Sequence, residues 1–377
     1  MTDLPGLRPV WGEVDLGAVR ANVRALRELA RPAVLLAVVK ADAYGHGAVP
    51  VARAALEAGA IWLGVALVEE GVALRAAGID APILVLSEPA PAAAGAVVAH
   101  RLTPVVYTPA GVEALATAVL DTNGGNALPV HLKVDTGMHR VGCTVEAAPG
   151  LVEAIMARPE LVLEGICTHL AVADEPGHAY TTKQVARFDT LLGELDARGI
   201  RPSIVHAANS AGLLGEPSHR YDLVRVGIAL YGVPPSAALD DRVELEPVLS
   251  LRARVSHVKE LPAGSRVSYG LRYELDQAGR VATVPVGYAD GVPRNLGLKG
   301  GEVLVRGQRF PIAGTVTMDQ LMVDVGREPI EVGDDVVLLG RQGDEEITAG
   351  EWAERLDIIA YEVVTGIGPR VPRRFVG

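Results

Sequence analysis

The residues with the clearest capacity for chemistry surround Lys40, which lies in the segment VVKADAYGHG. Only five of the 35 basic residues are lysines, so the chain uses arginine where it needs only surface charge. A crowded lysine at the end of an apolar run has a pKa below the usual ~10.4, which suits it to form a Schiff base with a carbonyl compound. The same pattern also fits a lysine whose alkyl chain lies on a strand while its ammonium group reaches water.

The elements that would position Lys40 are short apolar runs that alternate with helix-length segments. The segment after Trp11 has helical apolar spacing, with Asp15 placed to cap it, so we expect an amphipathic helix to open the fold. Continuous apolar character indicates strands that are covered on both faces. Eight βα units predict a TIM-type (β/α)8 barrel, with its active site at the C-terminal ends of the strands. The eight runs lie at 33–39, 61–66, 82–87, 102–107, 129–135, 161–169, 203–208 and 222–227.

From about Leu245 the pattern changes to strand-rich segments separated by Gly and Pro turns, with one helix near 349–356. We therefore predict two domains, a barrel over residues 1–242 and a mainly β domain over residues 243–377. The loop GVPPSAALDD joins them.

Composition excludes several classes of protein. About half of the residues are apolar, which is enough for a large core, and the formal net charge is −11 without a basic stripe, so we expect no nucleic-acid partner. No apolar run reaches the roughly 18 residues of a membrane span, and the first residues lack a secretory pattern, so a cytoplasmic location is expected. The two cysteines, Cys143 and Cys167, lack the paired spacing of a zinc site, and no metal is expected.

The segment around Lys40 resembles the pyridoxal 5′-phosphate (PLP) lysine signature of the alanine racemase family. The resemblance extends over about residues 31–376 and implies a PLP-dependent enzyme that interconverts L-alanine and D-alanine and supplies D-alanine for peptidoglycan. Seven further motifs in chain order carry it: KVDTGMHRVG, THLAVAD, HAANSA, VRVGIALYG, VSYG, VGYADG and TMDQ.

The resemblance implies two catalytic residues. Lys40 would hold PLP as a Schiff base and act as the acid/base on one face of the substrate. Tyr269, in VSYG, would act on the other face and would come from the partner subunit of a homodimer with shared active sites. Two groups are needed because racemisation removes a proton from one face of a planar carbanion and returns one to the other.

The resemblance also implies the cofactor contacts. Arg225 would lie against the pyridine nitrogen with His169 behind it. An arginine retains its proton, so the ring would be a weaker electron sink, which discourages side reactions such as transamination. The other residues implied to bind the cofactor are Tyr44, Asn209, Ser210, Gly227, Ile228 and Tyr231.

On the substrate side, the resemblance assigns Arg140, Met318 and Asp319 to the carboxylate. The lysine that matches Lys133 is often N-carboxylated in related enzymes, where it orients the arginine. N-carboxylation of Lys133 is therefore a hypothesis, supported by the unfavourable pair of like charges that an unmodified Lys133 would form with Arg140.

The chain departs from the family pattern at four positions. His139 replaces a small residue, Thr315 and Thr317 stand where arginine and cysteine are common, and Pro369 replaces a tyrosine that lines the substrate pocket. A wider pocket admits longer side chains, so a broader-specificity racemase acting on serine or lysine stays open as an alternative. A decarboxylase of basic amino acids fits less well, because Arg225 stands where such enzymes place a carboxylate. A non-catalytic PLP-binding protein would resemble the barrel alone.

Overall fold

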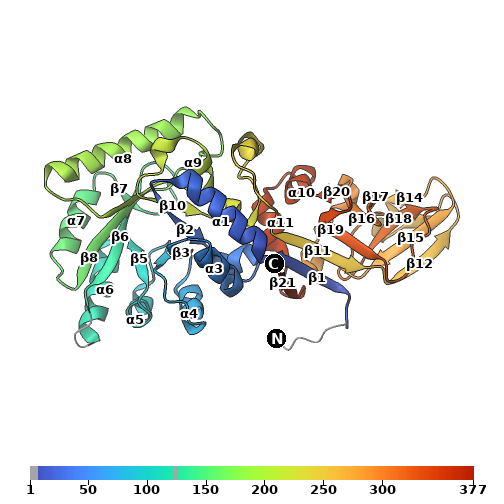
Figure 1. The fold of residues 1–377 in the computed structure, drawn as a ribbon, viewed down its shortest axis with the longest axis horizontal. Coiled ribbons are helices and arrows are strands. Elements are labelled where there is room, and N and C mark those ends of the chain that lie inside the picture. The colour runs from blue at the N-terminus through green and yellow to red at the C-terminus, as the bar shows by residue number, and fades with distance from the viewer. Residues whose placement is uncertain (1–6, 123–125) are drawn as a thin grey trace. The chain divides into compact units, whose positions relative to one another are not determined.

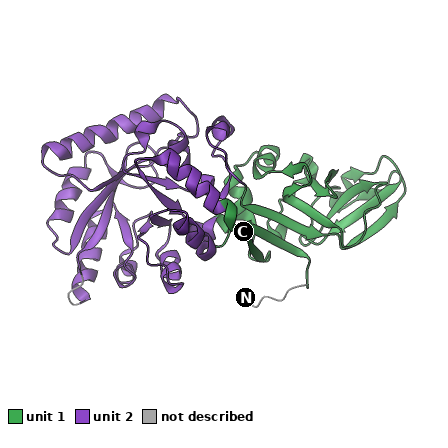
Figure 2. Ribbon diagram, in the orientation of Figure 1, with its two compact units in different colours: residues 1–18, 44–47, 247–377 green, residues 19–43, 48–246 purple. Residues whose placement is uncertain are grey.

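The computed structural model describes residues 7–122 and 126–377, which divide into two compact units. The barrel unit comprises residues 19–43 and 48–246, and the β unit comprises residues 1–18, 44–47 and 247–377 (Figure 2). The short segment 44–47 therefore belongs to the β unit although it includes the end of the turn that begins at Lys40.

Eight parallel strands of the barrel unit pair one after another, which confirms the predicted barrel (Figure 1), and a short ninth strand, β7 (Cys143–Thr144), pairs with β6 outside this order. Neighbouring strands pair in the order β10-β2-β3-β4-β5-β6-β8-β9. Backbone hydrogen bonds from Asp222 N to Val205 O and from Arg225 N to Ala208 O, both 3.0 Å long, connect the last strand to the first, so the barrel is nearly closed. The strands are β2 (Val34–Val38), β3 (Trp62–Val65), β4 (Ile83–Val85), β5 (Thr103–Val106), β6 (Leu128–Asp135), β8 (Leu161–Cys167), β9 (Ile204–His206) and β10 (Leu223–Val226).

Helices follow the strands and cover the barrel. The cap predicted at Asp15 is present, since Asp15 Oδ1 accepts a 3.0 Å hydrogen bond from Ala18 N at the start of α1. Sequence analysis missed α5 and α9, which are too short for a helical apolar period to be recognised. The helices are α1 (Leu16–Ala30), α3 (Ala48–Glu57), α4 (Val68–Ala76), α5 (Ala94–Ala99), α6 (Pro109–Asp121), α7 (Ala148–Met156), α8 (Ala179–Ala197) and α9 (Ser210–Leu214).

The β unit contains three sheets. The largest has the strand order β17-β16-β19-β11-β1-β21, with β20 paired to β19, and two smaller sheets pair β12-β15-β18 and β13-β14. The helices are α10 (Ala349–Leu356), which confirms the one predicted, and α11 (Ala360–Gly366). The strands are β11 (Leu249–Arg254), β12 (His257–Leu261), β13 (Arg266–Val267), β14 (Tyr273–Glu274), β15 (Gly279–Val284), β16 (Glu302–Val305), β17 (Gln308–Pro311), β18 (Leu321–Gly326), β19 (Asp335–Gln342), β20 (Glu345–Ile347) and β21 (Arg373–Val376).

The first element corrects a sequence expectation. An amphipathic helix was expected to open the fold, but strand β1 (Val10–Asp15) precedes α1. This strand pairs antiparallel with β11 and parallel with β21. Its partners lie more than 200 residues later in the chain, so no local pattern could reveal them.

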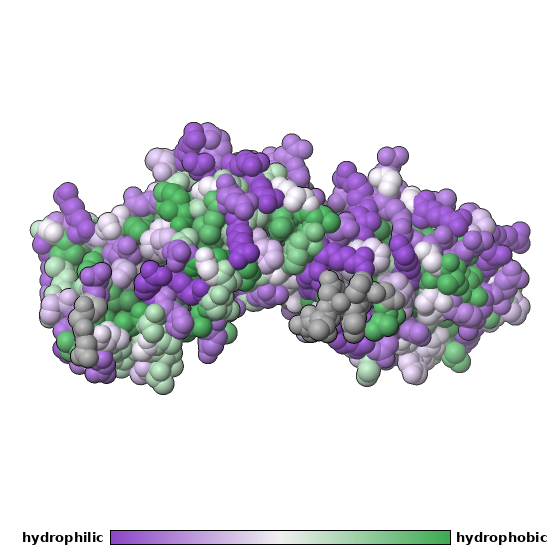
Figure 3. Space-filling view, turned by 60° about the horizontal axis from the view of Figure 1, so that its bottom comes forward, coloured by the Kyte–Doolittle hydropathy of each residue, from purple (hydrophilic) through white to green (hydrophobic). Residues whose placement is uncertain are grey.

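The surface is mixed in polarity. Hydrophilic side chains cover much of the face drawn in Figure 3, with smaller apolar areas between them. Within residues 7–122 and 126–377, no helix combines the length and the apolar character that a membrane crossing requires.

Candidate active site

Lys40 begins a turn with unusual backbone geometry at the C-terminal end of β2. The four residues after it, Ala41, Asp42, Ala43 and Tyr44, have φ values of 52°, 52°, 54° and 54°, so the segment forms a left-handed helical turn. Residues with a side chain adopt this conformation at a cost of roughly 1–2 kcal/mol each. Backbone strain of this kind persists where surrounding contacts enforce it and often marks a functional site.

Four cationic side chains act on one another inside the barrel unit. Burial lowers the pKa of Lys40, and the charge of Arg140 lowers it further against the opposing effect of Glu70. Burial also lowers the pKa of Lys133, with contributions from Arg225, Arg140 and Lys40. The Lys133 ammonium group donates a 3.2 Å hydrogen bond to the carbonyl oxygen of Leu86. The amines at this end of the barrel therefore lose their protons more easily than free lysine does.

Arg225, on β10, is buried among acceptors. Its guanidinium group donates to the carbonyl oxygens of Thr168 at 2.9 Å and Ala207 at 2.8 Å. It also donates to Nδ1 of His206 at 2.7 Å and to Nδ1 of His169 at 3.2 Å. Both histidines must be neutral to accept at Nδ1, and burial together with the Arg225 charge holds the pKa of each well below 6.5. Arg225 therefore keeps its charge.

The hydrogen bonds at Arg225 extend through the barrel. With Nδ1 of His206 accepting, its Nε2 donates to Nδ1 of His131 at 2.8 Å, and Nε2 of His131 donates to Glu164 at 3.2 Å. Gly165 makes room for this chain, since a Cβ there would lie 2.5 Å from the His131 ring. Sequence analysis assigned no role to His206 or His131, although His206 lies in the motif HAANSA.

Ser210, at the start of α9, lies at a convergence of backbone donors. Its Oγ accepts hydrogen bonds from Gly227 N at 2.9 Å and from Ala229 N at 3.4 Å. Asn209 caps the same helix by accepting from Gly212 N at 2.9 Å. Converging N–H groups beside a hydroxyl suit a phosphate oxygen, so these residues fit the phosphate group of PLP.

Two tyrosines that were expected at the cofactor have different surroundings. The Tyr231 hydroxyl donates a 2.8 Å hydrogen bond to Val38 O, so it helps to fix β2 just before Lys40. Tyr44 is buried, which raises the pKa of its hydroxyl to about 12. Ile228 is buried at the start of the 3-10 helix Ile228–Tyr231, and its neighbour Ala229 supplies the N–H that faces Ser210.

Tyr269 lies on the β unit with 70% of its surface exposed. The buried Thr315, which replaces the common arginine, donates a 3.0 Å hydrogen bond from its hydroxyl to the Tyr269 carbonyl oxygen. The Ser268 hydroxyl in turn donates to the Thr315 carbonyl oxygen. A residue that departs from the family pattern thus helps to hold the backbone of the predicted catalytic tyrosine.

Met318 is also exposed, and the VGYADG turn supports its backbone. Ala289 N donates to Met318 O at 3.0 Å, and a Cβ on Gly287 would lie 2.4 Å from the same oxygen, so only glycine permits this close approach. Asp319 forms a 2.7 Å ion pair with Arg370.

The other departures also have local explanations. His139 has a φ of 56°, a left-handed conformation in which histidine is among the more frequent non-glycine residues, and Asp135 accepts its backbone N–H at 3.0 Å. Thr317 donates a 2.7 Å hydrogen bond to Gln320 O, and Pro369 lies in an exposed turn before β21.

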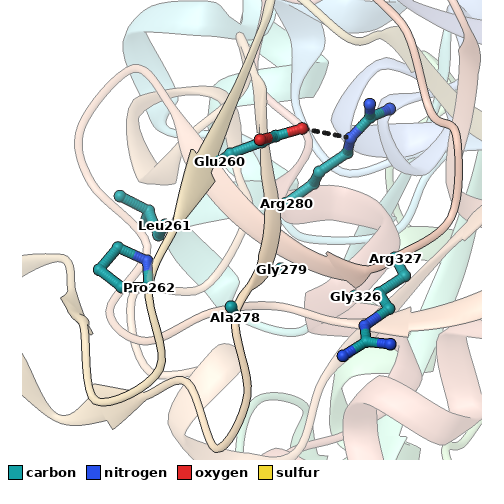
Figure 4. Close-up of a pocket in the computed structure, with 8 residues that line it drawn as sticks. All are labelled: Glu260, Leu261, Pro262, Ala278, Gly279, Arg280, Gly326 and Arg327. Atoms are coloured by element: carbon teal, nitrogen blue, oxygen red, sulfur yellow. Dashed lines mark ion pairs between the residues drawn. The ribbon is translucent and has the colours of Figure 1, made fainter.

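Two pockets differ in their chemistry. A small pocket in the barrel unit is lined by Lys133, Arg140, Thr168 and His169, together with their neighbours. A second pocket, in the β unit, contains none of the predicted site residues, and Glu260 pairs with Arg280 within it at 3.5 Å (Figure 4). The latter pocket is lined by Glu260, Leu261, Pro262, Ala278, Gly279, Arg280, Gly326 and Arg327. Among the residues that the structure describes, no group of His, Cys, Asp and Glu is suited to hold a metal.

The structure therefore distributes the predicted site residues over both units. The β unit carries Tyr44, Tyr269, Met318 and Asp319. The barrel unit carries Lys40, Lys133, Arg140, His169, Asn209, Ser210, Arg225, Gly227, Ile228 and Tyr231.

The neutral buried histidines predict a pH dependence of stability. The folded-state pKa of His206 lies below the 6.5 of the unfolded chain, so its contribution to stability is present above pH 6.5 and is lost as the pH falls below that value. Each such histidine changes the free energy of unfolding by up to about 1.4 kcal/mol per pH unit. Urea unfolding between pH 7.5 and 5 should show a shallower decline for His206→Gln than for the exposed control His178→Gln. Equal slopes would mean that His206 is protonated in the folded state.

Comparisons with known proteins support the resemblance to the alanine racemase family. Residues 14–235 match the alanine racemase N-terminal domain, and residues 248–375 match the alanine racemase C-terminal domain. An alanine racemase of Symbiobacterium thermophilum is 51% identical, over 100% of this chain and 99% of its own length. The solved alanine racemase of Streptomyces lavendulae has a TM-score of 0.93 at 42% identity, covering 99% and 98% of the two chains. A histidine racemase of Leuconostoc mesenteroides has a TM-score of 0.89 at 32% identity, covering 98% and 99%. The chain belongs to the alanine racemase family.

Proposed function

We propose that this chain interconverts L-alanine and D-alanine with PLP as its cofactor, and that Lys40 and Tyr269 transfer the protons. One observation carries the proposal. Lys40, at the end of β2, has a lowered pKa and lies in the same barrel as Arg225, whose histidine neighbours are neutral. The histidine racemase shows that this fold also serves another substrate. The 51% identity to an alanine racemase supports alanine over the serine or lysine alternative.

The residues of the barrel unit fit the cofactor. When bound, PLP withdraws electrons from the amino acid and makes its α-proton acidic. Lys40 would hold the aldehyde carbon, and Ser210 with the Gly227 N–H would hold the phosphate. Arg225 would face the pyridine nitrogen with His169 against it, and it would retain its proton because the neutral histidines only accept hydrogen bonds from it.

Two groups on opposite faces of the substrate would move the protons. The lowered pKa of Lys40 keeps a larger fraction of its amine neutral near pH 7, so the amine can accept the α-proton. The Tyr269 hydroxyl would return a proton to the other face, and the roles reverse for the opposite direction. Each direction thus uses one group as base and the other as acid.

We propose that Arg140 binds the substrate carboxylate and that Lys133 is N-carboxylated. A neutral Lys133 amine would add to carbon dioxide, forming a carbamate anion and releasing one proton. The lowered pKa of Lys133 favours the neutral amine, and the charges of Arg140, Arg225 and Lys40 would stabilise the anion. The modification would replace a repulsive cation by a partner for Arg140.

A homodimer is part of the same proposal. Tyr269, Leu271 and Met318 are 70%, 55% and 52% exposed, so large apolar groups of the β unit are available to another subunit. We propose that residues 243–377 deliver Tyr269, Met318 and Asp319 to the partner's active site. We also propose a cytoplasmic location and a role in D-alanine supply for peptidoglycan.

The first test is the activity itself. Purified protein with PLP and L-alanine should form D-alanine faster than it racemises L-serine, L-lysine or L-histidine, as followed by chiral chromatography. Lys40→Ala should abolish the reaction, and Tyr269→Phe should lower kcat by about 10²–10⁴-fold, the usual contribution of a general acid/base. Tyr221→Phe removes a hydroxyl that donates to Asp189 on α8, outside the predicted site, and serves as a control. Preference for another amino acid would overturn the substrate assignment.

A hybrid experiment tests the shared site. Mixed dimers of Lys40→Ala and Tyr269→Phe chains would contain one site with both residues intact and one site with neither. Random pairing should restore roughly a quarter of the wild-type activity, because half of the dimers are hybrids with one working site. A mixture that stays as inactive as its components would show that each site uses its own Tyr269.

Lys133 can be tested by mass spectrometry of the native protein. The intact mass should exceed the sequence mass by one carbon dioxide beyond the cofactor, and the increment should disappear on acidification because carbamates release carbon dioxide in acid. Lys133→Ala should lack the increment, whereas Lys183→Ala should retain it. An unmodified mass under bicarbonate would contradict the hypothesis.

A further inference from the structure

Glu70, on α4, connects two loops at the C-terminal end of the barrel. Its Oε1 accepts a 2.6 Å hydrogen bond from the backbone N–H of Ala41, the residue that follows Lys40. Its Oε2 accepts from Ala66 N at 2.8 Å and from Leu67 N at 3.1 Å, just before α4. Sequence analysis gave this glutamate no role.

The second oxygen of Glu70 has an ordinary function. A glutamate at the third position of a helix often accepts the N–H of the capping residue, which is Leu67 here. That function needs one oxygen and would be complete without Ala41. The contact with Ala41 is therefore additional, and it joins the turn after β2 to the helix after the neighbouring strand β3.

The turn after Lys40 needs such an anchor because its backbone is strained. Residues 41–44 are left-handed, and the relaxed alternative would turn the chain away from its present path. Two further contacts hold the turn, a 2.9 Å hydrogen bond from Ala43 N to Val39 O and a 2.7 Å hydrogen bond from Ala48 N to Asp42. Of these contacts, only the one made by Glu70 reaches a different βα unit.

Glu70 also brings negative charge to a cationic region. Arg140 is positive, and His169 is neutral. Among the charges that act on Lys40, Arg140 favours loss of its proton and Glu70 opposes it. The carboxylate thus limits how far the pKa of Lys40 falls.

We propose that Glu70 is a positioning residue for Lys40, which fixes the left-handed turn by bridging Ala41 to the start of α4 and places a negative charge beside the Lys40 amine. Its consequence for PLP binding and racemisation rests on the proposed function. The effect of Glu70 on the backbone of the turn does not rest on the proposed function, so the anchor and the proposed function can fail separately.

The test compares holoenzymes of Glu70→Gln, Glu70→Ala and Glu69→Gln. Glu69 is the exposed neighbour on the same helix, and its substitution removes the same charge. Glutamine keeps one acceptor oxygen, but its NH2 group cannot accept from Ala41 or from the N–H groups at Ala66 and Leu67. Hydrogen exchange followed by mass spectrometry should show at least tenfold faster exchange in the peptide spanning residues 40–48 for both Glu70 variants. Glu69→Gln should match the wild type.

Two further readouts separate positioning from general stability. PLP should dissociate at least several-fold faster from both Glu70 variants, while peptides from β6 and β8 keep wild-type exchange. The pH profile for PLP attachment to the apoprotein should move to lower pH in Glu70→Gln, because the negative charge beside Lys40 is removed while the positive charge of Arg140 remains.

The proposal is overturned if exchange at residues 40–48 and PLP release in Glu70→Gln equal those of Glu69→Gln. Should Glu70→Ala fail to fold, the nearly isosteric Glu70→Gln decides the question alone. Changed exchange in a protein that does not racemise alanine would retain the anchor and reject the proposed function. Unchanged exchange in an active racemase would reject the anchor and retain the proposed function.

Discussion

The central constraint in this structure is the crowding of positive charge at the C-terminal end of the barrel. Lys40, Lys133, Arg140 and Arg225 act on one another there, and burial lowers the pKa of both lysines. Such a group of cations is unfavourable unless anions join it. A phosphate, a substrate carboxylate and a carbamate on Lys133 would each supply negative charge, so the mutual repulsion of these cations would favour the binding of anions.

The same constraint explains the polar core of the barrel. Arg225 cannot lose its proton, so its neighbours must accept hydrogen bonds without adding charge. His169 and His206 do this as neutral rings, and His131 continues the chain to Glu164. The Arg225 donors leave His169 and His206 to accept at Nδ1, which fixes the tautomers of these rings and, through His206, that of His131. A buried polar network of this kind specifies one arrangement of the core more strictly than aliphatic packing does.

In the β unit the predicted site residues Tyr269 and Met318 are exposed, unlike the buried Lys133, Ser210 and Arg225 of the barrel unit. Exposed loops are held by backbone contacts instead of burial, and Thr315 provides one at Tyr269. Thr315 thus holds the backbone of the tyrosine loop through an uncharged hydroxyl. Asp135 similarly holds the backbone of His139, which has a left-handed conformation.

The sequence by itself determined the barrel, the β domain and the family, because apolar runs, turn residues and ordered motifs are local signals that tertiary contacts did not override. The tertiary structure alone decided the place of β1, the left-handed turn after Lys40, the histidine chain and the contact of Glu70 with Ala41. Three of these features join residues that lie from 29 to more than 200 positions apart, and the left-handed turn, although its residues are consecutive, is held by Glu70 from another βα unit. Residue types and spacing along the chain do not predict such contacts, because the contacts form only when separate βα units and strands come together.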